Sequence, residues 1–334
     1  LSEKLLKKIA DLILAKKNTP LKKIVKDVHF ADMAEIINEL NEDQGIYLIK
    51  LFDSEKTSEI LTELNEDVRE KILKALSVKE IADAFEELDS DDAADILGEL
   101  SEKRKEEVIS EISDNNLADD LKELLSYKED SAGGLMAKEL VHANENWSIT
   151  KCLKEIKKQG ENVTRVHSIY VVDDKQKLIG RLSLKDLIIS PAKNLIKDIY
   201  IPKVDSVNVY EDGEEVAKIM SKYDLEAIPV VDNNKKLVGR ITIDDIVDFI
   251  REEAEKDYQL AAGLVQDVDA EDSILDLTKA RLPWLFLGLV GGIGAFLIME
   301  GFQQAFNKYA VLFFFTPLIA AMAGIEATGL VAKG

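Results

Sequence analysis

The chain has 334 residues, of which 43 are Lys or Arg and 64 are Asp or Glu, so its formal net charge is −21. This excess of acid argues against nucleic acid as a partner and favours solubility or a need for cations. The only cysteine, Cys152, excludes an internal disulfide and is typical of a reducing compartment, and the length leaves room for two or three domains.

The N-terminal segment LSEKLLKKIADLILAKK is amphipathic and has no small-residue cleavage site, so we expect a helix there rather than a signal peptide. A large apolar residue then recurs every twelve residues, followed in all copies but the last by a capping residue. The apolar positions are Leu40, Phe52, Leu64, Leu76, Leu88, Leu100, Ile112 and Leu124, and the caps are Asn41, Asp53, Asn65, Ser77, Asp89, Ser101 and Ser113. One short helix per repeat predicts an α-helical superhelix with an acidic outer face, and a plain helical bundle is the alternative.

The repeat over residues 88–100, LDSDDAADILGEL, concentrates acids without a single basic residue. A helical wheel places Asp91, Asp95 and Glu99 on the face opposite the apolar residues, with Asp89 as the N-cap and Asp92 supporting the first turn. Like charges at this spacing destabilise a helix by about 0.2–0.5 kcal/mol per pair. Solvation or a divalent cation must offset that cost, and the EF-hand pattern is not met.

Residues 169–189 and 228–248 form an internal repeat at an offset of 59 residues. Each copy is expected to contain two strands joined by a polar turn and then a helix, with a further helix upstream. This pattern resembles paired CBS modules. The segments GRLSLKD and GRITIDD resemble the ribose-contacting motif of such modules, which implies that Ser183, Asp186, Thr242 and Asp245 could hold an adenine nucleotide.

The segments that are apolar and long enough to cross a membrane lie at the C-terminal end of the chain. Residues 282–299 carry no charge over eighteen positions and predict a transmembrane helix, and residues 309–325, interrupted by Pro317, are a second candidate. A buried core helix is the alternative for both. Lys279 and Arg281 suggest that the preceding residues stay in the cytoplasm, and Gly288 and Gly292 would allow close helix contact.

An acidic superhelix, a CBS pair and a C-terminal membrane region, in this order, resemble the MgtE family of magnesium transporters. The segments that carry the resemblance are DSDDAADIL, SAGGLM at residues 131–136, TIDDIVDFIREEAEKD and RLPWLFLGL. The resemblance implies a homodimeric, magnesium-selective channel rather than an enzyme, in the cell (inner) membrane, multi-pass, with its N-terminal domains in the cytoplasm. Those domains would sense Mg²⁺ and close the pore, and the CBS pair could also bind ATP. His29, His142 and His167 are scattered without a catalytic partner, which likewise argues against an enzyme.

The resemblance implies metal-sensing roles for acids in three places. These are Asp91 and Asp95 in the superhelix, Asp212, Glu214 and Asp224 in the second CBS copy, and Asp245, Asp248, Glu253 and Asp257 near or on the helix that leads to the membrane. Lys256 stands where another acid is expected, which puts the site at that end of the helix in doubt. Apposed acidic faces would spread apart without counterions, and Mg²⁺ would draw them together.

We therefore expect a multidomain chain with an all-α superhelical solenoid, α/β tandem CBS modules and an α-helical transmembrane segment. The expected domains are the superhelix at 1–130, the first CBS module at 131–190, the second at 191–249, a connecting plug helix at 250–280 and a membrane region at 281–334.

The membrane region departs from the family pattern. Members of the family have five transmembrane helices, whereas this chain has two candidates, so we expect an incomplete membrane region whose pore residues belong to later helices. The tail IEATGLVAKG replaces an expected Asn-x-Gly-x-Gln segment, and Glu326 has no assigned role. Two alternatives to a transporter that senses Mg²⁺ are an adenine-nucleotide-sensing CBS protein and a CorC-type exporter, although an exporter would place its membrane region before the CBS pair.

Overall fold

The computed structural model describes residues 3–160, 163, 165–166, 168–261, 274–301 and 311. The chain divides into two compact units, Leu1–Ile246 and Val247–Gly334. The second membrane candidate, apart from Val311, together with the tail and Glu326, lies outside the described residues, as does His167.

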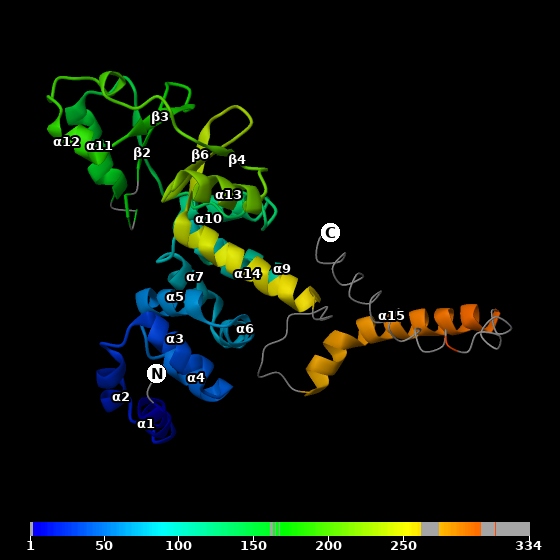
Figure 1. Ribbon diagram of the computed structural model, residues 1–334. Coiled ribbons are helices and arrows are strands. Elements are labelled where there is room, and N and C mark those ends of the chain that lie inside the picture. The colour runs from blue at the N-terminus through cyan, green and yellow to red at the C-terminus, as the bar shows by residue number, and fades with distance from the viewer. Residues whose placement is uncertain are drawn as a thin grey trace. The chain divides into compact units, whose positions relative to one another are not determined.

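The first unit begins with a helical region, which runs from dark blue to green in Figure 1. Its helices are α1 (Glu3–Leu14), α2 (Asn18–Val25), α3 (Phe30–Asn38), α4 (Glu42–Ile49), α5 (Ser54–Glu63), α6 (Glu66–Ala75), α7 (Val78–Phe85), α8 (Ser90–Gly98), α9 (Glu102–Glu111) and α10 (Asn115–Leu124). The expected N-terminal helix is confirmed as α1.

The helix starts follow the twelve-residue repeat. Helices α4 to α9 each begin directly after the predicted capping residue. The cap predicted at Ser113 is wrong, because α10 begins one residue later and Asp114 accepts from Asn116 N at 2.8 Å. The Ser113 N–H donates instead to Glu86, the residue that follows α7 in an earlier repeat, so a contact between repeats displaces the local cap.

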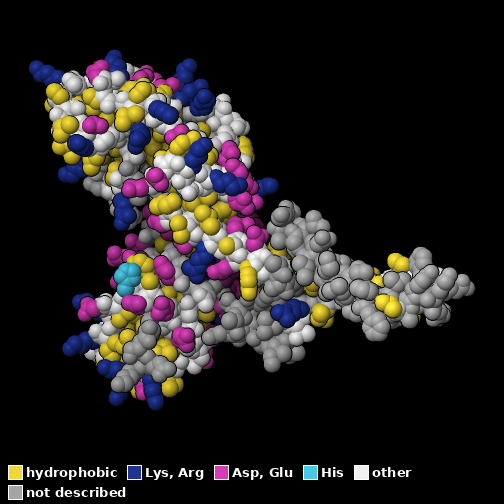
Figure 2. Space-filling view, viewed as in Figure 1, with side chains coloured by type: hydrophobic (Ala, Val, Ile, Leu, Met, Phe, Trp, Pro, Cys, Tyr) yellow, Lys and Arg dark blue, Asp and Glu magenta, His cyan; other side chains and the backbone are white. Residues whose placement is uncertain are grey.

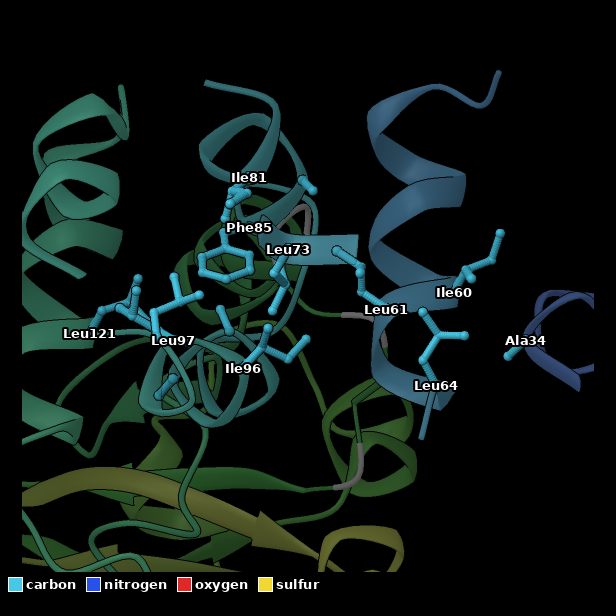
Figure 3. Close-up of a cluster of buried hydrophobic side chains, with 14 of the residues drawn as sticks. Ala34, Ile60, Leu61, Leu64, Leu73, Ile81, Phe85, Ile96, Leu97 and Leu121 are labelled. Carbon is cyan, nitrogen blue, oxygen red and sulfur yellow. The ribbon is translucent and has the colours of Figure 1, made fainter. Parts of the chain in front are cut away.

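The helices pack against their next-but-one neighbours. Contacts join α3 to α5, α5 to α7, and α7 to α9, while α4 packs on α6 and α8 on α10. Figure 3 shows the resulting core, to which α5, α7 and α8 contribute Leu61, Phe85 and Leu97. Such layered packing is that of a superhelical solenoid, as the repeat predicted.

Two three-stranded sheets follow the helical region. The first CBS copy contains β1 (Val141–Asn144), α11 (Ile149–Gln159), β2 (Ile169–Val172), β3 (Leu178–Leu182), α12 (Leu184–Ile189) and a short 3₁₀ helix, η2 (Ile196–Asp198). The second contains β4 (Val207–Asn208), α13 (Gly213–Tyr223), β5 (Ala227–Val231) and β6 (Leu237–Thr242). In each sheet the central strand pairs parallel with the first strand and antiparallel with the last.

The internal repeat is conserved in backbone detail between the two copies. Equivalent hairpin turns contain a residue with positive φ, Gln176 in one copy and Lys235 in the other, both at 63°. The two turns also bond to each other, because Leu178 N donates to Lys235 O at 2.9 Å and Leu237 N donates to Gln176 O at 3.1 Å. The two copies therefore associate through equivalent surfaces.

The SAGGLM segment joins the helical region to the second CBS copy rather than to the first. Gly133 N donates to Val209 O at 2.8 Å, and Ala137 and Arg240 exchange two backbone hydrogen bonds. Ala132 and Met136 are fully buried in a hydrophobic cluster that extends from the helical region into β5 and β6. The first CBS copy has a separate core. The helical region and the second CBS copy thus share one continuous core.

Two long helices complete the described chain. Helix α14 (Ile243–Ala261) begins directly after β6 and continues beyond Ile246. Helix α15 (Ile274–Gly301) contains Pro283, and its residues Thr278–Gly301 are long and apolar enough to cross a membrane. An 18-residue window within them has a mean hydropathy of 2.1 and no buried residue.

The tight packing of the SAGGLM segment is testable at Gly134. A Cβ there would collide with the Lys128 carbonyl oxygen, a backbone atom that cannot move aside cheaply. We expect Gly134→Ala to destabilise the chain by about 1–3 kcal/mol, measured by thermal denaturation.

The matched control for that substitution is Gly160→Ala. Gly160 ends α11 at φ −69°, and a Cβ there would meet no atom within 4 Å. We expect a change of less than about 1 kcal/mol. If the Gly134 variant melted no earlier than this control, the close approach would be refuted.

Candidate functional site

The first turn of α8 is buried. Ser90 is fully buried and Asp91 is only 9% exposed, although the helical wheel placed Asp91 on the solvent face. That expectation is wrong for Asp91, because the start of α8 packs against residues 138–139, where Lys138 N donates to Ser90 Oγ at 2.8 Å. Asp95 and Glu99, further along α8, are exposed as expected.

Asp91 and Asp245 interact directly through their charges. Burial raises the pKa of Asp91 well above its usual range, and the nearby carboxylates of Asp245, Asp92 and Asp89 raise it further. A hydrogen bond from Asp92 N, at 3.0 Å, opposes this rise. The structure thus brings together an acid of the helical region and an acid 154 residues later, both of which the sequence singled out.

Asp245 is held by the residue that precedes α14. Its Oδ2 accepts from Thr242 N at 2.8 Å and from Thr242 Oγ1 at 2.6 Å. Burial raises the pKa of Asp245 despite these hydrogen bonds and despite the Arg240 guanidinium, both of which lower it. The carboxylate is therefore fixed in orientation while its negative charge remains costly.

Arg240 supplies positive charge at this site. It is 5% exposed, its Nη2 lies 3.4 Å from Asp89 Oδ2, and its Nε donates to the Glu139 carbonyl oxygen. Asp89 occupies the predicted N-cap position of α8 but makes no side-chain capping bond. Its carboxylate pairs with Arg240 instead, so the cap that the sequence predicted is replaced by a contact to β6.

These residues can hold a small cation. Within the described part of the chain, no three Asp, Glu, His or Cys side chains gather in a ready-made metal cluster. Two carboxylates suit Mg²⁺, which keeps several of its waters and is usually bound by one or two carboxylates. Two apposed carboxylates about 4 Å apart repel by roughly 4 kcal/mol at an effective dielectric of 20, and a bound divalent cation would remove that cost.

Glu99, at the end of the acidic stripe, has a basic partner. Arg69 of α6 donates from Nε to both carboxylate oxygens of Glu99, at 2.9 and 3.1 Å, and also bonds it through Nη2. The sequence showed no base near Glu99 because Arg69 belongs to a different repeat. This acid is neutralised within the helical region.

The other predicted acids of the second CBS copy are exposed at the ends of α13. Asp212 caps the helix and accepts from Glu214 N at 3.0 Å, and Glu214 pairs with Lys218 at 3.4 Å. Asp224 ends the helix in the left-handed conformation, at φ 50°. Each of these acids has a local structural role.

Asp248, Glu253 and Asp257 lie on α14 beyond Ile246, in the second compact unit. Glu253 pairs with Lys256 at 2.9 Å, so the base that interrupts the expected acidic series also neutralises one of its members. Any joint site between these acids and the helical region remains a prediction.

The two candidate nucleotide motifs differ. Thr242 bonds to Asp245, whereas Ser183 makes no side-chain cap to α12, where Asp186 occupies the first turn.

Tyr170 was missed by the sequence reasoning. It is 2% exposed, its hydroxyl has no hydrogen-bond partner among the described residues, and burial raises its pKa to about 12. An unpaired buried hydroxyl is costly, but nothing in the sequence distinguished this tyrosine from an ordinary strand residue.

The family model of the MgtE intracellular N domain matches residues 28–130, and the CBS domain model matches residues 132–192 and 196–252. In its N domain and CBS pair, this chain belongs to the MgtE family. The resemblance stated from the sequence is thereby confirmed.

Two curated relatives are similar over this part of the chain. The magnesium transporter MgtE of Bacillus subtilis is 32% identical over 204 residues, which are 61% of this chain and 45% of that protein. The magnesium transporter MgtE of Thermus thermophilus is 36% identical over 200 residues, 59% of this chain and 44% of that protein. The matched region thus spans less than half the length of each relative. These relatives are transporters rather than enzymes, as the sequence indicated.

Two solved structures share the fold. The soluble part of a magnesium transporter has a TM-score of 0.65 at 28% identity and covers 75% of this chain and 99% of that one. The cytosolic domain of the Mg²⁺ channel MgtE in complex with ATP has a TM-score of 0.68 at 30% identity and covers 72% of this chain and 98% of that one. The superhelix followed by tandem CBS modules is therefore the architecture of MgtE cytosolic domains.

The raised pKa of Asp91 predicts the pH dependence of stability. Its pKa is higher in the folded than in the unfolded chain, so stability is lost as the pH rises through the folded value. Without divalent cations at about pH 7.5, Asp91→Asn should therefore stabilise the chain by about 1–3 kcal/mol. The gain should shrink as the pH falls and vanish toward about pH 3, where the carboxyl is largely protonated in the unfolded as well as the folded chain.

The control for this measurement is Asp119→Asn. The Asp119 side chain is 79% exposed and pairs with Lys122 at the surface. Thermal denaturation across this pH range should show a change below about 0.5 kcal/mol for it. If Asp91→Asn destabilised the chain at neutral pH in EDTA, the prediction that the negative charge of buried Asp91 destabilises the folded chain would be wrong.

Proposed function

We propose that this chain contains the cytosolic sensor and the first membrane helix of a magnesium transporter, which closes its pore when intracellular Mg²⁺ is sufficient. The observation that carries the proposal is that Asp91, buried at the start of α8, lies close enough to the half-buried Asp245 of α14 for the two negative charges to repel each other. The relatives that share both domains are named magnesium transporters, which supports Mg²⁺ as the cation.

The sensing ion would lie between Asp91 and Asp245. Asp95 is one turn further along α8 and would hold a second ion or a water of the first. On the family resemblance, Asp212, Glu214, Asp224, Asp248, Glu253 and Asp257 are further proposed ligands. Among them Glu253 is the weakest, because Lys256 already neutralises it.

Mg²⁺ would act by shifting a population. The compact arrangement brings the two carboxylates together and becomes more favourable when a cation occupies the pair. Several weakly bound ions acting together would give a steep response to concentration. Because α14 begins two residues before Asp245, a change at this carboxylate would be passed along a continuous helix toward the membrane.

The membrane part of the proposal depends on α15. Its apolar side chains face outward on all sides, for example Leu285 at 60%, Phe286 at 66% and Ile298 at 65% exposed. A helix that is apolar all round needs lipid or other helices to cover it. We propose that it spans the inner membrane of a multi-pass protein whose preceding domains are cytoplasmic, as Lys279 and Arg281 suggest.

The domain boundaries and the homodimer are proposed from the family resemblance and from exposed apolar residues. We propose the superhelix at 1–130, CBS modules at 131–190 and 191–249, a connecting helix within 250–280 and the membrane region from 281. Equivalent helices of the two CBS copies expose apolar residues, Leu184 and Ile188 on α12 and Ile243 and Val247 on α14. These residues would be covered in a homodimer that forms through the CBS modules and the membrane region.

A nucleotide is a second candidate ligand. One similar structure is a cytosolic domain in complex with ATP, and the CBS copies here contain Ser183 with Asp186 and Thr242 with Asp245. Asp245 would then serve both ligands, since it faces Asp91 and also bonds Thr242. We propose that ATP, if it binds, alters the Mg²⁺ response rather than replacing it.

Limited proteolysis of the full chain in detergent tests the proposal. We expect strong protection by millimolar-range Mg²⁺ and little by ATP alone, because the cation removes the repulsion that opposes the compact arrangement. The same titration with Na⁺ at matched ionic strength controls for simple screening. Protection by ATP without Mg²⁺, with no protection by Mg²⁺, would favour a nucleotide sensor instead.

A double substitution tests the ligands. Asp91→Asn with Asp95→Asn should abolish most of the difference in protection between Mg²⁺ and EDTA without unfolding the chain, because both amides retain a carbonyl oxygen but no charge that repels Asp245 or binds the cation. Asp119→Asn again serves as the exposed acidic control. If Mg²⁺ increased protection from proteolysis as much in the double variant as in the wild type, these acids would have only a structural role.

A further inference from the structure

At the start of two helices of the superhelix, a glutamate accepts hydrogen bonds from the N–H and the hydroxyl of one serine, but from different distances in the sequence. Ser77 is the N-cap of α7, whereas Ser90 is the first residue of α8. At α7, Glu80 Oε2 accepts from Ser77 N and from Ser77 Oγ, both at 2.7 Å. At α8, Glu139 Oε2 accepts from Ser90 N at 3.1 Å and from Ser90 Oγ at 2.8 Å. Glu80 lies three residues from its serine, whereas Glu139 lies 49 residues from Ser90, beyond the end of the helical region.

Helix α8 depends on this remote glutamate because its own cap is used elsewhere. Asp89 makes no capping bond and pairs with Arg240. A capping residue satisfies donors at a helix start that are otherwise unpaired. Since Ser90 is fully buried, water cannot replace Glu139 there.

Glu139 is itself fixed by the second CBS copy. Its carbonyl oxygen accepts from Arg240 Nε. The neighbouring Lys138 donates its N–H to Ser90 Oγ at 2.8 Å, and its Nζ pairs with Glu123 of α10 at 2.8 Å. The Lys138 side chain is 11% exposed, so this ion pair is largely shielded from water. Polar contacts therefore tie α8 and α10 to the segment that pairs with β6.

We propose that Glu139 is the positioning residue of the magnesium sensor. It caps α8 only while the helical region lies against the second CBS copy, and it thereby holds Asp91, one residue after Ser90, toward Asp245. This inference rests on the proposed Mg²⁺ sensing. Nothing in Glu139 contacts the ion, and its effect is to set how much Mg²⁺ is needed.

The contact between Glu139 and Ser90 has a specific effect on the Mg²⁺ concentration that the compact arrangement requires. Loss of this contact destabilises the compact arrangement relative to the spread one, so a higher Mg²⁺ concentration is needed to populate it. Saturating Mg²⁺ still restores the compact arrangement, because Asp91 and Asp245 are intact. A residue needed only for folding would instead lower the protection that saturating Mg²⁺ can reach.

The experiment compares Glu139→Gln with Glu80→Gln in the full chain in detergent, using Mg²⁺ titrations followed by limited proteolysis. Both substitutions remove one negative charge from a serine–glutamate cap. We expect Glu139→Gln to raise the half-protecting Mg²⁺ concentration by about three- to tenfold, with full protection at saturation. Glu80→Gln should change it by less than about twofold, because its cap lies within one helix.

A second variant, Ser90→Ala, keeps the Glu139 charge but removes the hydroxyl that bonds both Glu139 and Lys138 N. It should raise the midpoint in the same direction. Because both residues belong to one contact, Ser90→Ala combined with Glu139→Gln should shift the midpoint by less than the product of the two separate shifts.

The outcomes separate this inference from the function on which it rests. A wild-type chain with no Mg²⁺-dependent protection would overturn both. A normal wild-type response with equal midpoints for the Glu139 and Glu80 variants would overturn only the role of Glu139. So would reduced protection of the Glu139 variant at saturating Mg²⁺ with an unshifted midpoint, because a folding role alone explains that result.

Discussion

The burial of Asp91 near the negative charge of Asp245 is the constraint on which the proposed sensor depends. One continuous hydrophobic core joins the superhelix to the second CBS copy, and it presses the start of α8 against the junction of β6 and α14. Apolar burial contributes about 25 cal/mol per Å², enough over such an interface to hold two repelling carboxylates in place. The repulsion makes the contact responsive to cations, because a divalent ion stabilises it and its loss weakens it.

Four other acids that the sequence singled out are already paired with a basic side chain. Arg69 pairs with Glu99, Arg240 with Asp89, Lys218 with Glu214 and Lys256 with Glu253. Figure 2 shows acidic side chains interspersed with basic ones on the visible face of the first unit. Net charge alone is therefore a poor guide to the sensor, since these acids need no added ion, and the exposed pairs, such as Lys218 with Glu214, contribute little to stability. What distinguishes Asp91 is its burial beside another carboxylate.

Asp91 and Asp245 both lie within Leu1–Ile246, and three kinds of interaction meet around them. The shared core sets the approach of the domains, the Arg240 and Glu139 contacts fix the direction of α8, and the carboxylate pair supplies the response to cations. The first two are independent of metal. Ion binding thus has to overcome only the residual repulsion rather than assemble the interface, which is consistent with sensing by weakly bound Mg²⁺.

The sequence by itself determined the local structure. The twelve-residue repeat predicted where α4 to α9 begin, because caps and apolar periodicity act over a few residues. The 59-residue repeat predicted the two antiparallel strands of each sheet but not the parallel first strands, β1 and β4. It also named Asp91 and Asp245 through the family resemblance. Only the tertiary structure decided that Asp91 is buried and that Arg69 pairs with Glu99. The same holds for the two helix caps, Asp114 rather than Ser113 at α10 and Glu139 at α8. Each of these depends on a partner from another repeat or domain, and a one-dimensional pattern carries no information about which distant residues the packed core brings into contact.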